Sequence, residues 1–431
     1  MSSILMASVP AHGHVTPMLA VARHLVQRGD DVRFLTGGMF ADRVTATGAT
    51  FVALPREAEL DEEAVYRDPE RAALGGAKAV AHDIEHVFAK PAPHQYDALE
   101  TALGERPADV VLTDPGFVGG LVLLGHPRPA RPPLVVCGIM PLATASRDTA
   151  PFGLGLPPTR WFNRARNAVL AIAQRRIMAG ANRFGDEVYY KVHGAPMPCA
   201  LLDWNGQADA LVQFSVASFE YPRSDSPVPV HFVGAVNATG SQAALPDWWG
   251  DLDGTRPVVH VTQGTFANRD YAHAIAPTLE ALADEHVLVV VATGGRPVAT
   301  LPSLPANARA AEYLPYDDLL PRTAVYVANG GYGGVHYALR YGVPIVATGG
   351  KEDKPEVGAR VAWSGVGRRI RSERPSPTAL RRAVLDVLDQ PRYRQASEQI
   401  AADLAAAPGL AGMTAVIDRL VVNGSSVPSD S

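Results

Sequence analysis

Short apolar strands alternate with amphipathic helices in two long stretches of this sequence of 431 residues. In the first stretch, an apolar run at residues 4–9 precedes a helical pattern that ends at Gly29, and the strand pattern "DVRFLT" follows. The second stretch begins after Arg256 with "PVVHVTQGT" and continues to "VPIVATGG". Strands that alternate with helices through short connections form parallel sheets covered by helices on both faces. The sequence therefore predicts two doubly wound α/β domains.

The length of the chain and the segments between these stretches indicate how the domains are divided. A chain of 431 residues exceeds what one hydrophobic core usually accommodates. Residues 221–257 are rich in Pro, Gly, Ser and Trp, as interdomain linkers are. Residues 57–90 and 151–190 break the alternation with helices and loops, which predicts that a variable ligand is bound there. We predict a first domain at 1–220, a linker at 221–257, a second domain at 258–415, and a helix end with a flexible tail at 416–431.

The charge and cysteine content exclude several classes of protein. The formal net charge is −5, so neither nucleic acid nor an anionic membrane is expected as a partner. The basic runs "RWFNRARN" and "GRRIRSERP" are interpreted as solvated helix faces. The two cysteines, Cys137 and Cys199, rule out a disulfide scaffold and fit a reducing compartment. We find no signal peptide and no apolar run as long as a membrane span, and therefore expect a cytoplasmic protein without stable membrane insertion.

The strongest local motif is "VANGGYGG", in which a strand pattern runs into the cluster Gly330, Gly331, Gly333 and Gly334 and then into a helix pattern. Glycines there bring backbone N–H groups close to a ligand, and the helix N-terminus adds the positive end of its dipole. The motif predicts an anion site, although it is neither a Walker A loop nor the dinucleotide fingerprint. A sharp turn without a ligand is the alternative, but a turn alone rarely needs four glycines.

Small residues at the end of another strand predict a second wall of the same site. The strand pattern "PVVHVTQGT" ends in Gly264 and Thr265. Because the carboxyl ends of parallel strands meet at one edge of a sheet, and ligands bind at that edge, we expect this turn to face the same crevice as the glycine cluster.

Two histidines, His12 and His14, follow the first strand in the stretch "SVPAHGHVTP". Thr16 and Pro17 come next and are typical of a helix N-cap and of the first helical position. An imidazole at this point is either part of a polar loop or a catalytic base, and the residues alone leave both open. Asp114, which ends the strand pattern "DVVLT", is likewise either a turn residue or a partner for a histidine.

These motifs occur in the order found in the macrolide-type bacterial glycosyltransferases, which belong to the UDP-glycosyltransferase family. The segments that resemble the family are "PAHGHVTPMLAVARHLVQRGDDVRFLT", "VTQGT", "AEYLPYDDLLPRTAVYVANGGYGGVHYALRYGVPIVATGGKEDKPEVGARV" and "SGVG". The resemblance spans nearly the whole chain and is most specific over residues 312–367. It implies the GT-B architecture, in which two facing Rossmann-like domains bind the acceptor and the nucleotide sugar. It also implies an inverting, metal-free transfer of the sugar.

The resemblance implies a catalytic dyad in the first domain. His14, and not His12, matches the general base of the family, and Asp114 matches its carboxylate partner. In this reading His14 takes the proton of the acceptor hydroxyl as the oxygen attacks, while Asp114 orients the imidazole and offsets its charge. His12 is interpreted as a loop residue that lines the acceptor entrance.

The resemblance also implies a donor site in the second domain. Because fixed dipoles would stabilise the leaving diphosphate, neither a cofactor nor a metal ion is expected. The implied contacts are Thr265 and Asn329 near the diphosphate, Tyr313 stacked on the nucleobase with Leu314 beside it, the amides of Gly331, Gly333 and Gly334 on the phosphates, and Asp353 and Lys354 at the sugar hydroxyls.

Three of these positions depart from the usual family pattern and concern the identity of the donor. Asn329 stands where a diphosphate-binding histidine is usual, and it can donate a hydrogen bond but cannot carry charge. Tyr337 replaces a glutamate that often binds the ribose hydroxyls, which makes a deoxyribonucleotide donor as compatible as a ribonucleotide. Lys354 replaces a glutamine and adds a positive charge beside the sugar or the phosphates.

We therefore predict a glycosyltransferase that moves a sugar from a UDP or dTDP donor to a hydroxyl of a small lipophilic acceptor, such as a natural-product aglycone. A transferase acting on a lipid or sterol acceptor is one alternative, against which the lack of an obvious amphipathic anchor speaks. A non-catalytic relative that binds nucleotide or aglycone and assists a partner enzyme is another, and the presence of both His14 and Asp114 disfavours it. A monomer and a homodimer are both compatible with the sequence.

Overall fold

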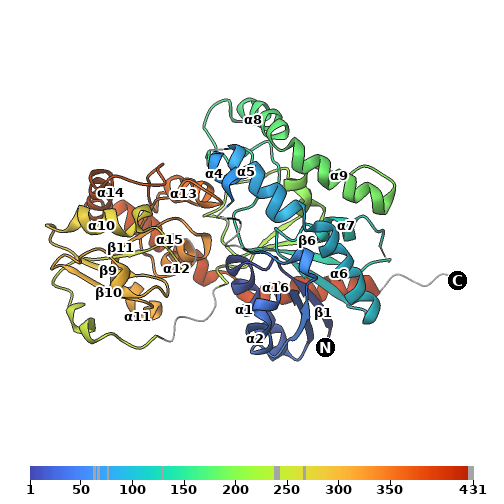
Figure 1. Cartoon of the computed structure of the whole chain (residues 1–431), viewed down its shortest axis with the longest axis horizontal. Helices are drawn as coiled ribbons and strands as arrows, with labels where there is room; N and C mark the ends of the chain where they lie inside the picture. The colour runs from blue at the N-terminus through green and yellow to red at the C-terminus, as the bar shows by residue number, and fades with distance from the viewer. Residues whose placement is uncertain are drawn as a thin grey trace.

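The computed structural model describes residues 1–61, 65, 68–74, 77–128, 130–236, 243–265 and 268–425. Two α/β domains lie next to each other, the first running from blue to green and the second from yellow to orange in Figure 1. Successive residues of a strand belong to different cores, since Leu5 and Ala7 pack in one apolar cluster and Ile4 and Met6 in another. A strand buried on both faces in this way needs helices on both sides of its sheet. The fold is the doubly wound α/β pair that the sequence predicts.

The sheet of the first domain reverses its strand order at the point where the predicted dyad lies. Among the described residues it has seven parallel strands in the order β3–β2–β1–β4–β5–β6–β7. Neighbours β1 and β4 are paired so that Ala7 lies opposite Thr113. Residues that follow β1 and β4 therefore meet at a switch point, where open parallel sheets bind ligands. The strands are β1 Ser3–Ala7, β2 Asp31–Thr36, β3 Thr50–Ala53, β4 Val110–Thr113, β5 Leu134–Gly138, β6 Ala210–Gln213 and β7 Val230–Phe232.

Helices of the first domain cover its sheet and fill the two irregular segments. The described parts of 57–90 and 151–190 consist of helices and loops, as expected. One of these helices, η3, is a π-helix, a rare form that is frequently found at functional sites. The helices are α1 His12–Arg28, α2 Ala41–Thr45, α4 Pro69–Ala73, α5 Ala77–Asp83, η3 Ile84–Ala89, α6 Ala92–Glu105, α7 Gly119–Leu124, α8 Asn163–Ile177 and α9 Ala179–His193, with 3-10 turns η1 Gly38–Phe40, η2 Arg56–Ala58 and η4 Leu201–Gln207.

The second domain repeats this arrangement. In the described part of the chain its sheet has six parallel strands in the order β10–β9–β8–β11–β12–β13, with the switch point between β8 and β11. The strands are β8 Val258–Thr262, β9 Leu288–Ala292, β10 Ala308–Ala311, β11 Thr323–Ala328, β12 Ile345–Ala347 and β13 Gly367–Arg369. The helices are α10 Ile275–Leu282, α11 Tyr316–Leu319, α12 Tyr332–Arg340, α13 Lys354–Trp363, α14 Pro377–Asp389 and α15 Pro391–Ala406, with 3-10 turns η5 Asp247–Asp251, η6 Tyr271–His273, η7 Val298–Thr300 and η8 Leu320–Arg322.

Helix α1 begins earlier than the sequence predicts. The expected start at Thr16 and Pro17 is wrong, because α1 starts at His12 with Ala11 as its N-cap, and Pro17 lies inside the helix. The amides of His14 and Val15 both donate to the carbonyl of Ala11, and these bonds close the first turn. A proline this close to a helix start removes one backbone hydrogen bond, which the packed helix tolerates. The end at Gly29 is as predicted, with that glycine in the left-handed conformation.

Two of the predicted domain boundaries differ from the observed packing. Residues 230–232, placed in the linker, form strand β7 at the edge of the first sheet. Residues 409–415, placed in the second domain, begin helix α16 (Gly409–Ser425), whose Met413 and Ile417 are buried in the core of the first domain. The chain thus crosses between the domains twice. The short edge strand β7, preceded by Pro227 and Pro229, gave too weak a pattern to reveal where the first crossing begins. Of the predicted tail, 426–431 lies outside the described residues.

Among the described residues, no single helix is long and apolar enough to cross a membrane. Helices α15 and α16 pass that test only when they are taken together, with a bend of 46° between them.

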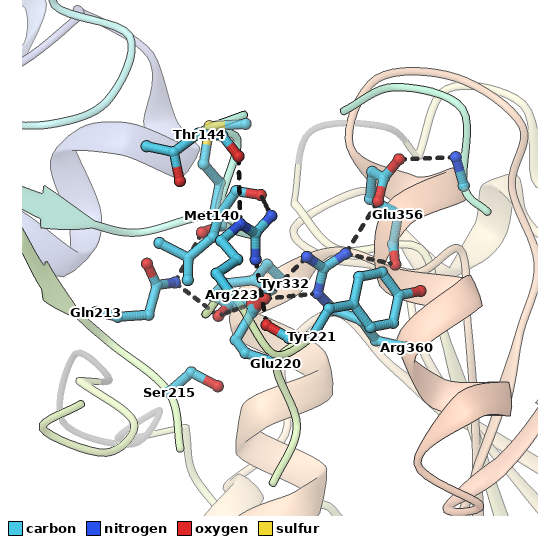
Figure 2. A network of polar contacts seen from close by, with 12 residues as sticks. Met140, Thr144, Gln213, Ser215, Glu220, Tyr221, Arg223, Tyr332, Glu356 and Arg360 are labelled. Carbon is cyan, nitrogen blue, oxygen red and sulfur yellow. Dashed lines mark hydrogen bonds and ion pairs between the residues drawn. The ribbon is translucent and has the colours of Figure 1, made fainter. Parts of the chain in front are cut away.

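A buried network of polar side chains holds the two domains together, and Arg360 of α13 lies at its centre (Figure 2). Its guanidinium nitrogens lie 2.8 Å from Glu220, in the segment between β6 and β7 of the first domain, and 3.0 Å from Glu356 on α13. Although burial lowers the pKa of Arg360, the two carboxylates raise it above the ordinary value, so the arginine stays charged. Glu220 also accepts a hydrogen bond from the hydroxyl of Tyr332, which in turn accepts one from Gln213.

The same network reaches a loop of the first domain. The carboxylate of Glu356 accepts hydrogen bonds from the amides of Gly153 and Gly155, at 2.9 and 2.7 Å. Arg369 donates to the carbonyl of Gly155 at 2.7 Å. The loop at residues 151–157 is therefore held against helix α13 of the second domain.

Candidate active site

A cavity of about 730 Å³ opens between the domains and is lined by residues of both. The first domain contributes the start of α1, parts of α4 and α5, helix η3, and residues after β5 and β6. The second domain contributes the turns after β8, β9, β10 and β11 and the loop before α13. Both switch points therefore open into one cavity. A concave site at such a place is where an α/β protein is expected to bind its ligands.

His14 and Asp114 meet on the first-domain wall of this cavity. The Nδ1 atom of His14 lies 2.8 Å from the Oδ1 atom of Asp114. The aspartate is fully buried, while the imidazole is 17% exposed and lines the cavity. A carboxylate can only accept hydrogen bonds, so it fixes the proton on Nδ1 and leaves the lone pair on Nε2. The pair has the geometry of a histidine base and the group that orients it.

Backbone groups hold Asp114 in place. Its Oδ2 accepts a hydrogen bond from the amide of Val9 at 2.8 Å, and its Oδ1 accepts one from Gly116 at 2.7 Å. The first bond ties the end of β4 to the end of β1, and the second closes a turn directly after the aspartate. Gly116 also leaves room for the imidazole, because a Cβ at that position would lie 2.9 Å from the Cε1 atom of His14. The turn and the dyad are thus one local structure, in which Asp114 is both a turn residue and a partner of His14.

His12 lies at the start of helix α1 and not in a loop, which corrects the sequence interpretation. It lines the cavity, as the prediction of an acceptor-side position requires. Its ring packs edge-on against Phe40, with ring centres 5.1 Å apart.

The predicted anion site lies at the N-terminus of α12. The reason why glycine is present differs from one position of this turn to the next. Gly330 has a φ of 91°, a conformation that favours glycine, and a Cβ at Gly334 would lie 2.9 Å from the hydroxyl of Tyr326. At Gly331 and Gly333, in contrast, a Cβ would have no described atom within 4 Å, and both residues line the cavity. Among the described residues no side chain caps this helix. The amides of its first turn are therefore presented to the cavity, as an anion site requires.

The remaining donor residues lie around this helix end. Thr265 lines the cavity after β8, and Tyr313 lines it after β10 with 52% of its surface exposed. The phenol of Tyr313 lies over Gly295, where a Cβ would come within 2.2 Å of its oxygen. Leu314 also lines the cavity but is 1% exposed and packs in the core behind Tyr313. Each predicted donor residue in this group therefore borders the cavity.

Asn329 connects the two turns of the switch point. Its side-chain amide donates to the backbone carbonyl of Gln263 at 3.0 Å, and the residue is 7% exposed. One amide proton is thus used to join the end of β11 to the end of β8. An amide carries a second proton, which is the one that remains for a ligand.

The loop before α13 brings Asp353 and Lys354 to the cavity in a strained and charged setting. Glu352 has a φ of 58°, which is unusual for a residue other than glycine, and its carboxylate forms an ion pair with Lys354. Burial raises the pKa of Asp353 to about 6, against the opposing charges of Lys354 and His14. The lysine charge expected beside the sugar is therefore shared with Glu352, a residue that the sequence reading did not single out.

The acceptor side of the cavity contains residues that no motif indicated. Arg71 and Asp83 form a bidentate pair at 2.6 and 2.9 Å on the cavity wall. They lie twelve residues apart on α4 and α5, and such a spacing gives no periodic signal. The rest of this wall is mainly apolar and includes Leu60, Val80, Ile84, Val87, Phe88, Ile139, Met140, Phe152 and Phe214.

Comparison with known proteins identifies relatives along the whole chain. The model of the erythromycin biosynthesis protein CIII-like C-terminal domain matches residues 276–421. The 4'-demethylrebeccamycin synthase of Lentzea aerocolonigenes is 40% identical over 433 residues, which cover 97% of this chain and 99% of the relative. UDP-glycosyltransferase 2 of Phaeomoniella chlamydospora is 32% identical and covers 97% of this chain and 95% of its own length.

Solved structures show the same fold. The glycosyltransferase of kitacinnamycin superposes with a TM-score of 0.72 at 22% identity, covering 97% of this chain and 98% of its own. A calicheamicin glycosyltransferase superposes with a TM-score of 0.68 at 22% identity, covering 99% and 100%. The chain therefore belongs to the UDP-glycosyltransferase family with the GT-B fold, is of the macrolide type within it, and is itself a glycosyltransferase.

Proposed function

We propose that this glycosyltransferase moves a sugar from a nucleoside diphosphate, UDP or dTDP, to a hydroxyl of a small lipophilic acceptor, with inversion and without a metal ion. One observation carries the proposal. The His14–Asp114 pair and the uncapped start of α12 face the same interdomain cavity. A base and an anion site on opposite walls are what the transfer of a sugar between two oxygen atoms needs.

The first wall deprotonates the acceptor. The lone pair on Nε2 of His14 accepts the hydroxyl proton as the acceptor oxygen forms its bond to the anomeric carbon. Asp114 stabilises the imidazolium that results and keeps the ring in its orientation. A positioned base of this kind typically accelerates a reaction by about 10² to 10⁴.

The second wall receives the leaving group. As the new bond forms, the bond between the anomeric carbon and the diphosphate oxygen breaks, and the electron pair stays on the diphosphate. Amides of Gly333 and Gly334 at the start of α12 stabilise the developing charge with fixed dipoles. Entry of the acceptor from the wall opposite the diphosphate leads to inversion at the anomeric carbon. Asp353, which lines the cavity, is proposed to bind sugar hydroxyls.

The substrates are proposed from the cavity walls and from the relatives. The apolar residues of the acceptor wall favour a lipophilic molecule with few polar groups. A relative is named for a rebeccamycin derivative and another as a UDP-glycosyltransferase, which supports a natural-product acceptor and a nucleotide-sugar donor.

Substitution of the proposed base tests the reaction. His14→Ala is expected to lower transfer to hydroxyl acceptors by about 10² to 10⁴ and to leave nucleotide affinity nearly unchanged. Single-turnover assays with UDP-glucose and dTDP-sugars on a panel of aglycones, with nucleotide affinity from calorimetry, measure both quantities. Transfer that persists within a few-fold of the wild type would show that the base is misassigned.

Nucleotide binding by itself identifies the donor class. A ligand that binds the native state raises its stability, so UDP and dTDP should each raise the melting temperature according to their affinity. The nucleotide that gives the larger rise at equal concentration is expected to be the one carried by the sugar donor. A rise with neither nucleotide would contradict the proposed donor site.

A further inference from the structure

Helix α8 turns two amide side chains towards the protein and exposes large apolar side chains on its outer side. Asn167 is buried on the inner side and donates a hydrogen bond to the carbonyl of Arg147 at 3.0 Å. Gln174, two turns later, donates to the carbonyl of Phe152 at 2.6 Å. On the opposite side Val169 is 68% exposed and Ile172 is 57% exposed. A surface helix of a soluble protein normally has the reverse arrangement.

The exposed apolar face continues into the residues that precede the helix. Trp161 is 72% exposed and Phe162 is 86% exposed. Phe162 has a φ of 54°, which is a strained conformation for an aromatic residue. Large apolar side chains exposed close together in sequence, with strain retained among them, are typical of an interaction surface. We call Trp161, Phe162, Val169 and Ile172 the α8 apolar face.

Arginines are frequent in the segment that carries the α8 apolar face. Between residues 149 and 185 the sequence has no Asp or Glu and six arginines, at 160, 164, 166, 175, 176 and 183. Arg175 and Arg176 are exposed and follow Ile172 on the outer side of the helix. The guanidinium of Arg160 lies 5.5 Å above the ring of Trp161. Arg164 forms an ion pair with Asp148 at 3.3 Å, and the other arginines leave this segment with an excess of positive charge, although the chain as a whole has a net charge of −5.

The position of α8 in the molecule leaves this face accessible. The helix lies at the outer end of the first domain, at the top of Figure 1. Its inner side is connected to the cavity, because Phe152, whose carbonyl accepts from Gln174, lines the acceptor wall. A surface bound at α8 would thus lie close to the loop that borders the acceptor site.

We propose that the α8 apolar face and its arginines dock this enzyme on an anionic lipid surface. Aromatic and aliphatic side chains flanked by arginines are what an interfacial helix uses to enter the headgroup region while its charges bind anionic lipids. A second copy of the chain is disfavoured as the occupant, because a symmetric dimer would bring two cationic faces together. The basic run "RWFNRARN", interpreted from the sequence as a solvated helix face, is on this view a peripheral membrane anchor. The proposal does not depend on the donor or on the base assigned above.

Vesicle sedimentation tests the proposal with the full-length enzyme. The wild type is expected to bind vesicles of equimolar phosphatidylcholine and phosphatidylglycerol and to bind pure phosphatidylcholine far more weakly. An arginine near an anionic surface contributes roughly fivefold in affinity, so Arg175→Glu with Arg176→Glu should reduce binding by at least about 25-fold. Raising the salt concentration from about 0.1 M to about 1 M should also reduce binding to anionic vesicles. Val169→Ser with Ile172→Ser should also reduce binding.

Matched variants on other exposed surfaces serve as controls. Val422→Ser, at a side chain that is 66% exposed on α16, and Arg382→Glu, at an exposed position on α14, should leave vesicle binding unchanged. Transfer to a water-soluble acceptor should be the same in all of these variants, which establishes that they fold.

Three results would overturn the proposal. They are the absence of binding to anionic vesicles, equal binding to both kinds of vesicle, and α8 variants that bind like the wild type. A wild-type dimer that Val169→Ser with Ile172→Ser converts to a monomer would assign the face to a second copy instead.

Discussion

At the scale of single residues, glycines of the same turn have different roles. Gly330 is needed for its backbone conformation and Gly334 for the close approach of Tyr326. At Gly333 neither reason applies, since its φ is not positive and a Cβ there would meet no described atom within 4 Å. A side chain at Gly333 would extend into the cavity without meeting the described protein, which fits the proposed phosphate site.

Gly333→Ala separates this role from folding. Alanine in the first turn of α12 should leave the free energy of unfolding unchanged or raise it by up to about 1 kcal/mol, because alanine is a better helix former. The same methyl group would obstruct the diphosphate, so the affinity for UDP or dTDP should fall by about tenfold or more. Calorimetry and denaturant unfolding measure the two effects. Gly104→Ala, in helix α6 with no described atom near its Cβ, is the control and should change neither ligand affinity nor the fold.

Asp353 gives the stability of the protein a defined dependence on pH. Burial raises its pKa in the folded state to about 6, from an ordinary value of 3.8. The folded state therefore binds more protons than the unfolded state between these values, and ionisation of Asp353 destabilises the fold as the pH rises towards 6. This cost is fully present above pH 6 and is lost as the pH falls below the ordinary value.

Asp353→Asn should accordingly stabilise the protein most at neutral and alkaline pH. The gain in the free energy of unfolding is expected to be about 3 kcal/mol near pH 8 and about 1 kcal/mol near pH 4.5. Denaturant unfolding at the two pH values measures it, with Asp318→Asn at an exposed carboxylate of α11 as the control. A gain of equal size at both pH values would contradict the raised pKa. Transfer should fall in the same variant if Asp353 binds the sugar.

At the scale of elements, the contact of α12 and α13 with the segment between β6 and β7 depends on an ion pair that is shielded from water. Arg360 and Glu220 have side chains that are 0% exposed. Removal of one member of such a pair leaves the other charge buried without compensation, which typically costs about 3–5 kcal/mol. An exposed ion pair contributes at most about 1 kcal/mol, since water and salt screen it.

Glu220→Ala is therefore expected to lower the free energy of unfolding by about 3–5 kcal/mol. Glu285→Ala removes the partner of Arg381, an arginine that is 54% exposed, and should cost less than about 1 kcal/mol. Chemical denaturation of both variants gives the comparison. Equal losses would mean that the interdomain network is no more important for stability than a surface pair.

At the scale of the whole molecule, the C-terminal helix α16 packs against the first domain. The Oγ1 atom of Thr414, on α16, lies 3.1 Å from the Nε2 atom of His24, on α1. Asp418 accepts hydrogen bonds from Arg28. Ile417 is fully buried among residues of the first sheet and of α1. The first domain is therefore completed by a segment from the far end of the chain.

Ile417→Ala should then destabilise the first domain although it lies far from it in sequence. A buried Ile→Ala change usually costs about 2–5 kcal/mol. Val422→Ala, at a side chain that is 66% exposed on the same helix, should stay within about 0.5 kcal/mol of the wild type. Thermal and denaturant unfolding distinguish the two. A neutral result for Ile417→Ala would mean that α16 contributes little to the stability of the first domain.

Local sequence patterns determined the two sheets and the positions of most candidate site residues. Alternating strands and helices specify the two parallel sheets, and the positions of His14, Asp114 and the glycines after β11 follow from where each strand ends. Parallel strands bring their carboxyl ends to one edge, so residues that are far apart in sequence meet there without further information. Gly29 predicted a helix end, and the glycines after β11 predicted a tight turn. Glycine is informative at such positions because a left-handed backbone or a close approach admits few other residues.

Contacts distant in sequence were decided only by the tertiary structure. The pairing of Arg71 with Asp83, the burial of Arg360 beside Glu220, and the return of α16 to the first domain depend on which surfaces the packed elements present to each other. The outward apolar side of α8 is of the same kind, because periodicity shows that a helix has an apolar side but not which way that side faces. Periodicity is a property of neighbouring residues, whereas burial depends on every element that packs around them.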